Sequence, residues 1–197
     1  MKKYTSLSLS RYLAELSAKK PIPGGGSASA YVACLGMGLA EMVAGIGLNK
    51  ATPESKTILE KTIQLLRKAR KDALQVVDLD PQVYSTVIKS YQQAKKISDP
   101  VKKAQVVEEA LENSFRLQAD LAFLISMAKK TAESLEGLVK GSIQNDLRLS
   151  LRFLSAAFFG AYETARINVV YLRNPEKKNQ AEQALAELKK QFCASGN

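Results

Sequence analysis

The sequence contains no histidine, and this absence excludes three common kinds of functional site. The chain cannot build a Ser-His-Asp triad, a histidine metal site or a histidine general base. Its two cysteines, Cys34 and Cys193, lack the spacing of a zinc site and are too few for a disulfide framework. Any acid–base chemistry must therefore fall to Asp, Glu, Lys, Tyr or Cys side chains.

A recognisable signal peptide or membrane span is also lacking. The opening residues, Met1 to Tyr4, lead into mixed polar sequence rather than into a secretory signal. The least polar stretch, 24–40, is rich in Gly, Ala and Ser, and it falls short of the ~20 strongly apolar residues of a spanning helix. We therefore expect a cytoplasmic protein without a membrane partner.

The charge is strongly positive, with 29 basic and 19 acidic residues giving a net charge of +10. Such an excess can attract nucleic acid, anionic lipid or a polyanionic small molecule. The lysines are spread along the chain, however, without a dense block or a basic patch interleaved with aromatic residues. We expect most of this charge to be a solvated face, and we expect no nucleic-acid partner.

The remaining pattern is that of helices. With 46% hydrophobic and 24% charged residues, the chain resembles an ordinary globular protein of one domain, 1–192, followed by a loose tail, 193–197. A capping residue precedes a proline at Pro53, Pro100 and Pro175, which is typical of a helix start. The sequence therefore predicts an all-α, single-domain bundle of about six helices, over residues 6–19, 26–48, 53 to beyond 84, 100–139, 145–172 and 175–192.

Two of these predicted helices, 26–48 and 145–172, are apolar on most sides. A helix of this kind is buried in a core or in an interface. A single small domain has little room for two such helices, so we expect 145–172 to be a long buried central helix and one of the pair to meet another subunit. A homodimer or larger homo-oligomer is the prediction.

A proline-rich turn followed by a glycine run, 21–26, opens the second predicted helix. Glycine lets a backbone approach a ligand closely, and a helix N-terminus offers free amides and the positive end of a dipole. The segment is neither a Walker loop nor a dinucleotide fingerprint, and no strand precedes it. The glycine run has two possible roles, which are to bind an anion or to allow close packing against another helix.

Two carboxylates, Asp78 and Asp80, lie two residues apart in the third predicted helix, so they point to different sides of it. Pro81 should disturb this helix and free backbone carbonyls. A desolvated carboxylate can hold a raised pKa and donate a proton near neutral pH. The alternative is that both are exposed surface acids.

Polar residues near the ends of the fifth predicted helix could likewise have a structural role or belong to a functional site. Asp146, near its start, could be a helix cap or part of a pocket. Asn168 lies in an apolar run, where an amide without partners is costly, so it should bond to the protein or to a ligand.

Three segments in order resemble a known family. The segment 21–27, with the Ala/Gly helix that ends at Val43, is similar to the signature of the cyclodeaminase domain of formimidoyltransferase-cyclodeaminase. The stretches 77–84 and 159–168 resemble two further parts of that domain, and the resemblance covers nearly the whole chain. The sequence therefore resembles the family of formimidoyl-tetrahydrofolate cyclodeaminases and methenyl-tetrahydrofolate cyclohydrolases.

The resemblance implies an all-helical, usually dimeric bundle that binds tetrahydrofolate and needs neither a metal nor a further cofactor. Family members close a formimino group onto a second nitrogen and expel ammonia, or they hydrolyse the methenyl bridge to a formyl group. The family's acid–base aspartate maps onto Asp80. The turn, which comprises Pro23, Gly24, Gly25, Gly26 and Ser27, is expected to contact the folate, and Asp146 and Asn168 are expected to line the pocket.

Two departures from the family pattern leave an alternative open. The approach to the central helix, 140–146, is shorter and lacks the usual asparagines, and Thr164 replaces an asparagine. The alternative is a catalytically degenerate family member that acts as a ligand-binding or interaction protein.

Overall fold

The computed structural model describes residues 3–194, and every regular element in that range is helical. The predicted all-α bundle is confirmed. Three predicted helices differ in length from those observed. The first, α1 (Leu9–Leu16), is shorter than the predicted 6–19, and α4 (Pro100–Glu133) ends before the predicted 139, in a turn where Gly137 has a φ of 79°. The last, α6 (Pro175–Ala194), continues into the predicted tail, of which 195–197 lie outside the described residues. The elements are a 3-10 turn (Tyr4–Ser6), α1 (Leu9–Leu16), α2 (Gly25–Gly47), a second 3-10 turn (Leu48–Lys50), α3 (Pro53–Ala94), α4 (Pro100–Glu133), α5 (Ile143–Tyr171) and α6 (Pro175–Ala194).

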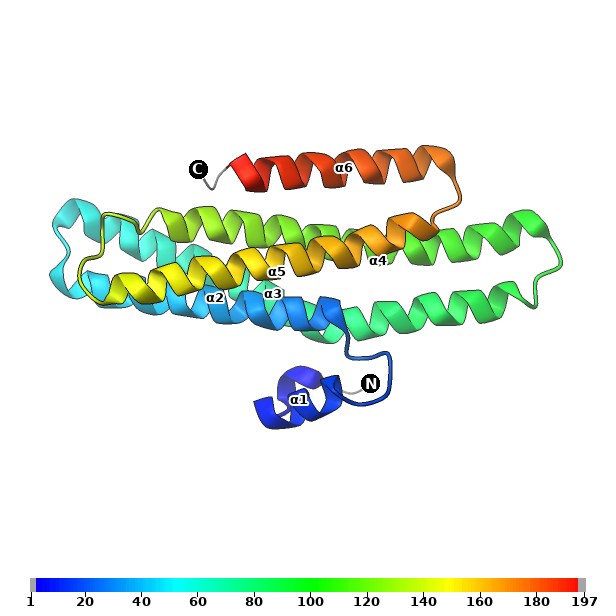
Figure 1. Cartoon of the computed structure of the whole chain (residues 1–197), viewed down its shortest axis with the longest axis horizontal. Helices are drawn as coiled ribbons and strands as arrows, with labels where there is room; N and C mark the ends of the chain where they lie inside the picture. The colour runs from blue at the N-terminus through cyan, green and yellow to red at the C-terminus, as the bar shows by residue number, and fades with distance from the viewer. Residues whose placement is uncertain (1–2, 195–197) are drawn as a thin grey trace.

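The four long helices α2 to α5 form a bundle in which each packs against the next, and α5 returns to pack against α2 (Figure 1). Helices α2 and α4 are therefore diagonal to each other. Helix α6 lies along α4 and α5, and the short N-terminal segment with α1 lies on the opposite side of the bundle. The predicted central helix, α5, is flanked by α2, α4 and α6.

The predicted helix starts are confirmed by their caps. The Thr52 hydroxyl accepts the amide of Ser55 at the start of α3. The Asp99 carboxylate accepts the amide of Val101 at the start of α4, and the Asn174 side chain accepts that of Lys177 at the start of α6. Each bond satisfies one of the amides that a helix N-terminus leaves free.

Helices α2 and α5 approach each other closely through glycines. A Cβ atom on Gly36 would lie 2.9 Å from Cγ of Leu154, and one on Gly160 would lie 2.2 Å from Oγ of Ser29. Helix α2 is long and apolar enough to cross a membrane by composition alone. Its alanines Ala30, Ala33 and Ala40 are fully buried, and 39% of its apolar window is buried inside the bundle.

The bundle is incomplete at one end because α2 is short. Helix α2 has 23 residues and α3 has 42, which corresponds to about 35 Å and about 63 Å of helix. Beyond the start of α2, the later half of α3 therefore continues beside α4 and the end of α5 without a fourth long helix (Figure 1). The glycine turn lies at the point where this three-helix section begins.

Candidate functional site

A cavity of about 450 Å³ opens where α2 begins, between α3, α4 and α5. The glycine turn closes one end, and three tyrosines line the walls together with aliphatic side chains. A mainly apolar cavity with a few polar groups is the usual form of a small-molecule site. The lining residues are Pro21, Ile22, Gly24, Gly25, Gly26, Asp80, Tyr84, Val87, Ile88, Tyr91, Leu111, Ser114, Thr164, Ile167, Asn168 and Tyr171.

Asp80 is the only residue with a formal charge among those that line this cavity. Its Oδ2 accepts the backbone N–H of Ser27 at 3.0 Å, and its Oδ1 accepts Nε2 of Gln118 at 2.8 Å. One carboxyl group on α3 thereby joins the start of α2 to the middle of α4. A Cβ atom on Gly26 would lie 2.3 Å from Oδ1 of Asp80, so only glycine leaves room for this junction.

Burial raises the pKa of the Asp80 carboxyl above its usual value, and the hydrogen bonds from Ser27 and Gln118 oppose that rise in part. Desolvation disfavours the charged form, whereas donors to the carboxylate favour it. Asp80 therefore holds its proton to a higher pH than an exposed aspartate does. This property suits a group that must both donate and accept a proton.

Asp78 points to the other side of α3, as the two-residue spacing predicted. Its carboxylate accepts the backbone amides of Tyr4 and Thr5 and the hydroxyl of Thr5. Neither Asp78 nor Asp80 is exposed, so the surface-acid alternative was wrong. Asp78 fixes the N-terminal segment against the bundle, and it takes no part in lining the cavity.

Pro81 does not end α3, but it frees a carbonyl as predicted. A proline nitrogen cannot donate to the carbonyl four residues earlier, which here belongs to Val77. The hydroxyl of Ser27 fills this vacancy by donating to Val77 O at 3.0 Å, and it also contacts the hydroxyl of the buried Tyr12 at 3.1 Å. Ser27 therefore ties α2 to α3 through its amide at Asp80 and through its hydroxyl at Val77.

The glycine turn places free backbone donors at the cavity. Among the residues that the structure describes, the N–H groups of Gly25 and Gly26 have no hydrogen-bond acceptor. Gly24, Gly25 and Gly26 all line the cavity, as expected. Pro23 is buried behind the turn, and Ser27 supports Asp80 instead of lining the cavity.

The structure separates the two candidates on α5. Asn168 lines the cavity, and its Nδ2 donates to the carbonyl of Thr164 at 2.8 Å. Asp146 lies in the first turn of the same helix, 22 residues before Asn168, which is a distance of about 33 Å along the helix. Within one subunit Asp146 is therefore not part of this site, contrary to the expectation that both residues line one pocket.

Gln118 was not predicted as a site residue, although the sequence carries a signal for it. Gln118 is fully buried, and it continues the buried face of α4 at helical spacing between Ser114 and Leu121. A lone amide on such a face needs a specific partner. The wall residues Tyr91, Ser114 and Tyr171 were not predicted either, because they come together only when three helices are packed.

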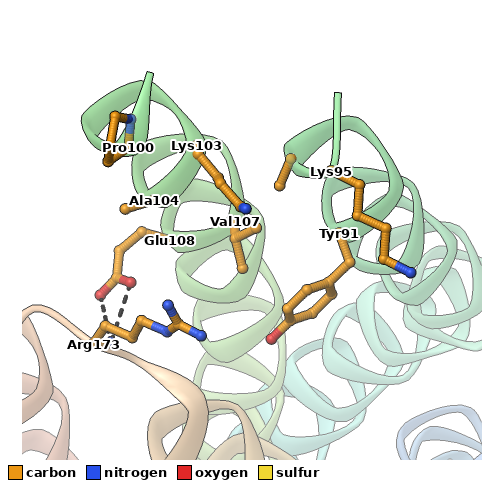
Figure 2. Close-up of a pocket in the computed structure, with 9 residues that line it drawn as sticks. Tyr91, Lys95, Pro100, Lys103, Ala104, Val107, Glu108 and Arg173 are labelled. Carbon is orange, nitrogen blue, oxygen red and sulfur yellow. Dashed lines mark hydrogen bonds between the residues drawn. The ribbon is translucent and has the colours of Figure 1, made fainter. Parts of the chain in front are cut away.

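A second cavity, of about 460 Å³, continues along α3 and α4 and shares Tyr91 with the first. Figure 2 shows the ammonium group of Lys103 and the guanidinium group of Arg173 directed toward the space beside the Tyr91 ring. Neither cationic group has an ion-pair partner among the described residues. Glu108 also lines this cavity, but its carboxylate accepts the backbone amides of Arg173 and Asn174.

No group of three or more His, Cys, Asp or Glu side chains that could hold a metal ion occurs in the range 3–194. The fold and the site define an all-helical protein with a protonatable carboxyl group in a mainly apolar cavity. A family model described as formiminotransferase-cyclodeaminase matches residues 8–187. The chain therefore belongs to the formiminotransferase-cyclodeaminase family, which confirms the resemblance noted from the sequence.

Similar proteins are found among vertebrate sequences and among solved structures. The formimidoyltransferase-cyclodeaminase of Gallus gallus is 26% identical over 186 residues, covering 91% of this chain and 34% of that protein. The Mus musculus protein is 25% identical over 164 residues, covering 82% of this chain and 30% of that protein. The chain thus spans about a third of the length of these relatives.

The crystal structure of formiminotetrahydrofolate cyclodeaminase from Thermotoga maritima superposes with a TM-score of 0.86. The match covers 96% of this chain and 92% of that chain, with 20% sequence identity. At this identity the likeness shows the fold.

The bond between Ser27 and Val77 gives a stability prediction. Replacing Ser27→Ala leaves the Val77 carbonyl without a partner, so we expect a loss of about 1–3 kcal/mol in the free energy of unfolding. In a Pro81→Ala background, the new amide at position 81 can bond to Val77, and the same replacement should cost about 1 kcal/mol less. Urea unfolding of the wild type, the two single variants and the double variant measures this coupling between Ser27 and Pro81.

The control is Ser155→Ala, because within residues 3–194 the Ser155 hydroxyl bonds only to the Leu151 carbonyl of the same helix, α5. Ser155→Ala should lower the free energy of unfolding by the same amount in the wild-type and the Pro81→Ala backgrounds. If the cost of Ser27→Ala is also equal in both, the hydroxyl does not replace the bond that Pro81 removes.

Proposed function

We propose that this protein is a tetrahydrofolate one-carbon enzyme that closes a formimino group into a methenyl bridge with release of ammonia. The observation that carries the proposal is the half-buried Asp80 carboxyl group, held by two helices at the end of an apolar cavity. The names of the relatives, which refer to cyclodeaminases, favour ammonia release over hydrolysis of the bridge. A cytoplasmic location remains our expectation from the sequence.

Starting from the protonated formimino group, whose exocyclic nitrogen already carries two protons, the reaction needs one proton to move between two nitrogens. The second folate nitrogen attacks the formimino carbon and forms a tetrahedral carbon, and that nitrogen must then lose its proton. The departing nitrogen must gain a proton before it leaves as ammonia. The Asp80 carboxylate accepts the first proton and, as the carboxylic acid, donates it to the leaving nitrogen, so the enzyme returns to its starting state.

The two cavities suit the two ends of a folate. Tyr84 and Tyr91 give the first cavity flat aromatic walls against which a pterin ring can pack. From Asp80 to Tyr91 the distance along α3 is about 16 Å, and beyond Tyr91 the unpaired cations Lys103 and Arg173 face the second cavity (Figure 2). A glutamate tail carries carboxylates, which these cations would attract.

Replacing Asp80→Asn should lower turnover of formimino-tetrahydrofolate by a factor of about 10² to 10⁴, because the amide cannot carry the proton. The near-ultraviolet absorbance of methenyl-tetrahydrofolate follows product formation directly. The matched control is Asp78→Asn, which removes a carboxylate two residues away on the opposite side of α3, and it should keep most of the turnover.

Methenyl-tetrahydrofolate is tested in the same assay, since loss of its absorbance would identify hydrolysis of the bridge instead. A wild-type protein that binds folate but turns over neither substrate would support the degenerate alternative and contradict our proposal. Equal losses in Asp78→Asn and Asp80→Asn would show that the effect is structural.

A charge reversal tests the proposed site for the glutamate tail. Lys103→Glu should raise the KM for the folate substrate about tenfold with little change in kcat, because one contact to a charged group is worth about 1.5–3 kcal/mol. Arg173→Glu should act in the same way. The control is Lys102→Glu, on the same helix but outside the cavity lining. A similar rise in KM in all three variants would show that the effect comes from the change in net charge and not from a specific contact.

We also propose that the protein is a homodimer joined through the outer face of α2. Leu35, Met42 and Ile46 are 53%, 42% and 47% exposed on this face, with Gly38 and Gly45 between them. Such an apolar patch is typical of an interface, and the glycines would allow the close approach of a second copy of α2 across a twofold axis.

Met42→Lys should convert the dimer to a monomer, because it buries a charge in the interface. Sedimentation equilibrium measures the change, which we expect to be at least 100-fold in the dissociation constant. Met127→Lys is the control, since Met127 is 47% exposed on α4, diagonal to α2. A monomeric wild type, or a Met42→Lys dimer of unchanged strength, would contradict the proposal.

A further inference from the structure

The contact between Gln118 and Asp80 is the only hydrogen bond that the Gln118 side chain makes in the described part of the chain. Nε2 of Gln118 donates to Oδ1 of Asp80, whereas Oε1 of Gln118 is buried without a partner. A buried amide oxygen without a partner opposes folding. Packing alone would favour an apolar side chain at position 118, so the glutamine calls for another explanation.

The surrounding residues are shaped to admit this contact. A Cβ atom on Gly26 would lie 2.2 Å from Nε2 of Gln118 and 2.3 Å from Oδ1 of Asp80. The absence of a side chain at position 26 is therefore a requirement of the amide–carboxyl pair, and it brings the first turn of α2 against both groups. Gln118 is absent from the cavity lining, so it reaches the site only through Asp80.

We propose that Gln118 is a positioning residue, whose amide fixes the orientation of the Asp80 carboxyl group toward the cavity and favours its ionised form. This inference rests on the proposed function only in the claim that the oriented carboxyl group transfers protons to a folate. The amide acts on one oxygen, while the backbone N–H of Ser27 acts on the other. Together the two donors set the plane of the carboxyl group.

Few other ionisable groups face this pair. Tyr12 of α1 lies behind Ser27, and Tyr84, Tyr91 and Tyr171 lie in the cavity walls. Phenols carry no charge near neutral pH, and no Lys, Arg or Glu lines the first cavity. The hydrogen bond from Gln118 is therefore the one side-chain hydrogen bond that favours the ionised form of Asp80 among the described residues, and it acts together with the backbone N–H of Ser27 against the effect of burial.

Gln118→Met keeps the size of the side chain and removes its amide. Without this donor, the carboxylate of Asp80 is less stable, and we expect its affinity for a proton to rise about tenfold. The infrared carboxyl signal that disappears in Asp80→Asn reports this titration without any substrate. In the enzymatic assay, kcat should fall at least tenfold and the Asp80 limb of its pH profile should move to higher pH, with KM little changed.

Gln118→Glu supplies a second and opposite test. A protonated glutamic acid can donate to Asp80 as the amide does, whereas an ionised glutamate repels it. Turnover by this variant should therefore approach that of the wild type only at acidic pH. The matched controls are Gln105→Met and Gln105→Glu, which change an exposed glutamine of α4 that contacts Glu109, and they should leave both readouts unchanged.

The outcomes separate this inference from the proposed function. An Asp80 titration that moves in Gln118→Met, with no turnover of either folate by the wild type, keeps the inference and contradicts the proposed reaction. Turnover by the wild type, with an Asp80 titration and a pH profile that do not move in Gln118→Met, overturns the inference. A loss of activity in Gln118→Glu that is the same at every pH would also overturn it.

Discussion

The hydrogen bonds to the Asp80 carboxyl group hold the site together. A carboxyl group on α3 accepts one donor from the first turn of α2 and another from the middle of α4. The junction forms only because Gly26 has no side chain. Burial at this point raises the pKa of Asp80, so the interaction that joins the helices also prepares the carboxyl group for proton transfer.

The position of the cavity follows from two further features of the chain. Helix α2 is about half as long as α3, and the space that it does not fill lies directly beyond Asp80. Pro81, next to Asp80, frees the Val77 carbonyl, which the Ser27 hydroxyl then uses to hold the start of α2 in place. Asp78 anchors the N-terminal segment on the other side of α3. Residues 77–81, which make up little more than one turn of α3, thus organise the surroundings of the site.

Much of the fold could be predicted because its signals are local. A capping residue before Pro53, Pro100 and Pro175 marks three helix starts, and the structure confirms each of them. The opposite directions of Asp78 and Asp80 follow from helical geometry alone. The contribution of Gln118 could not be predicted in the same way, because it depends on which helices meet at the glycine turn.

Asp146 shows the limit of reasoning from a resemblance. The resemblance assigns Asp146 and Asn168 to one pocket, but 22 residues of helix keep them about 33 Å apart in one subunit. Spacing along a helix predicts a shared face, and only packing shows whether two ends of that helix reach the same cavity.

A structure of the protein with bound 5-formyl-tetrahydrofolate, a stable reduced folate, tests the central claim most directly. The account predicts that the nitrogens that carry the one-carbon unit lie within hydrogen-bond distance of the Asp80 carboxyl group, with the pterin between the glycine turn and Tyr84 and the glutamate beside Lys103 and Arg173. A folate bound elsewhere, or no bound folate at a saturating concentration, would contradict it.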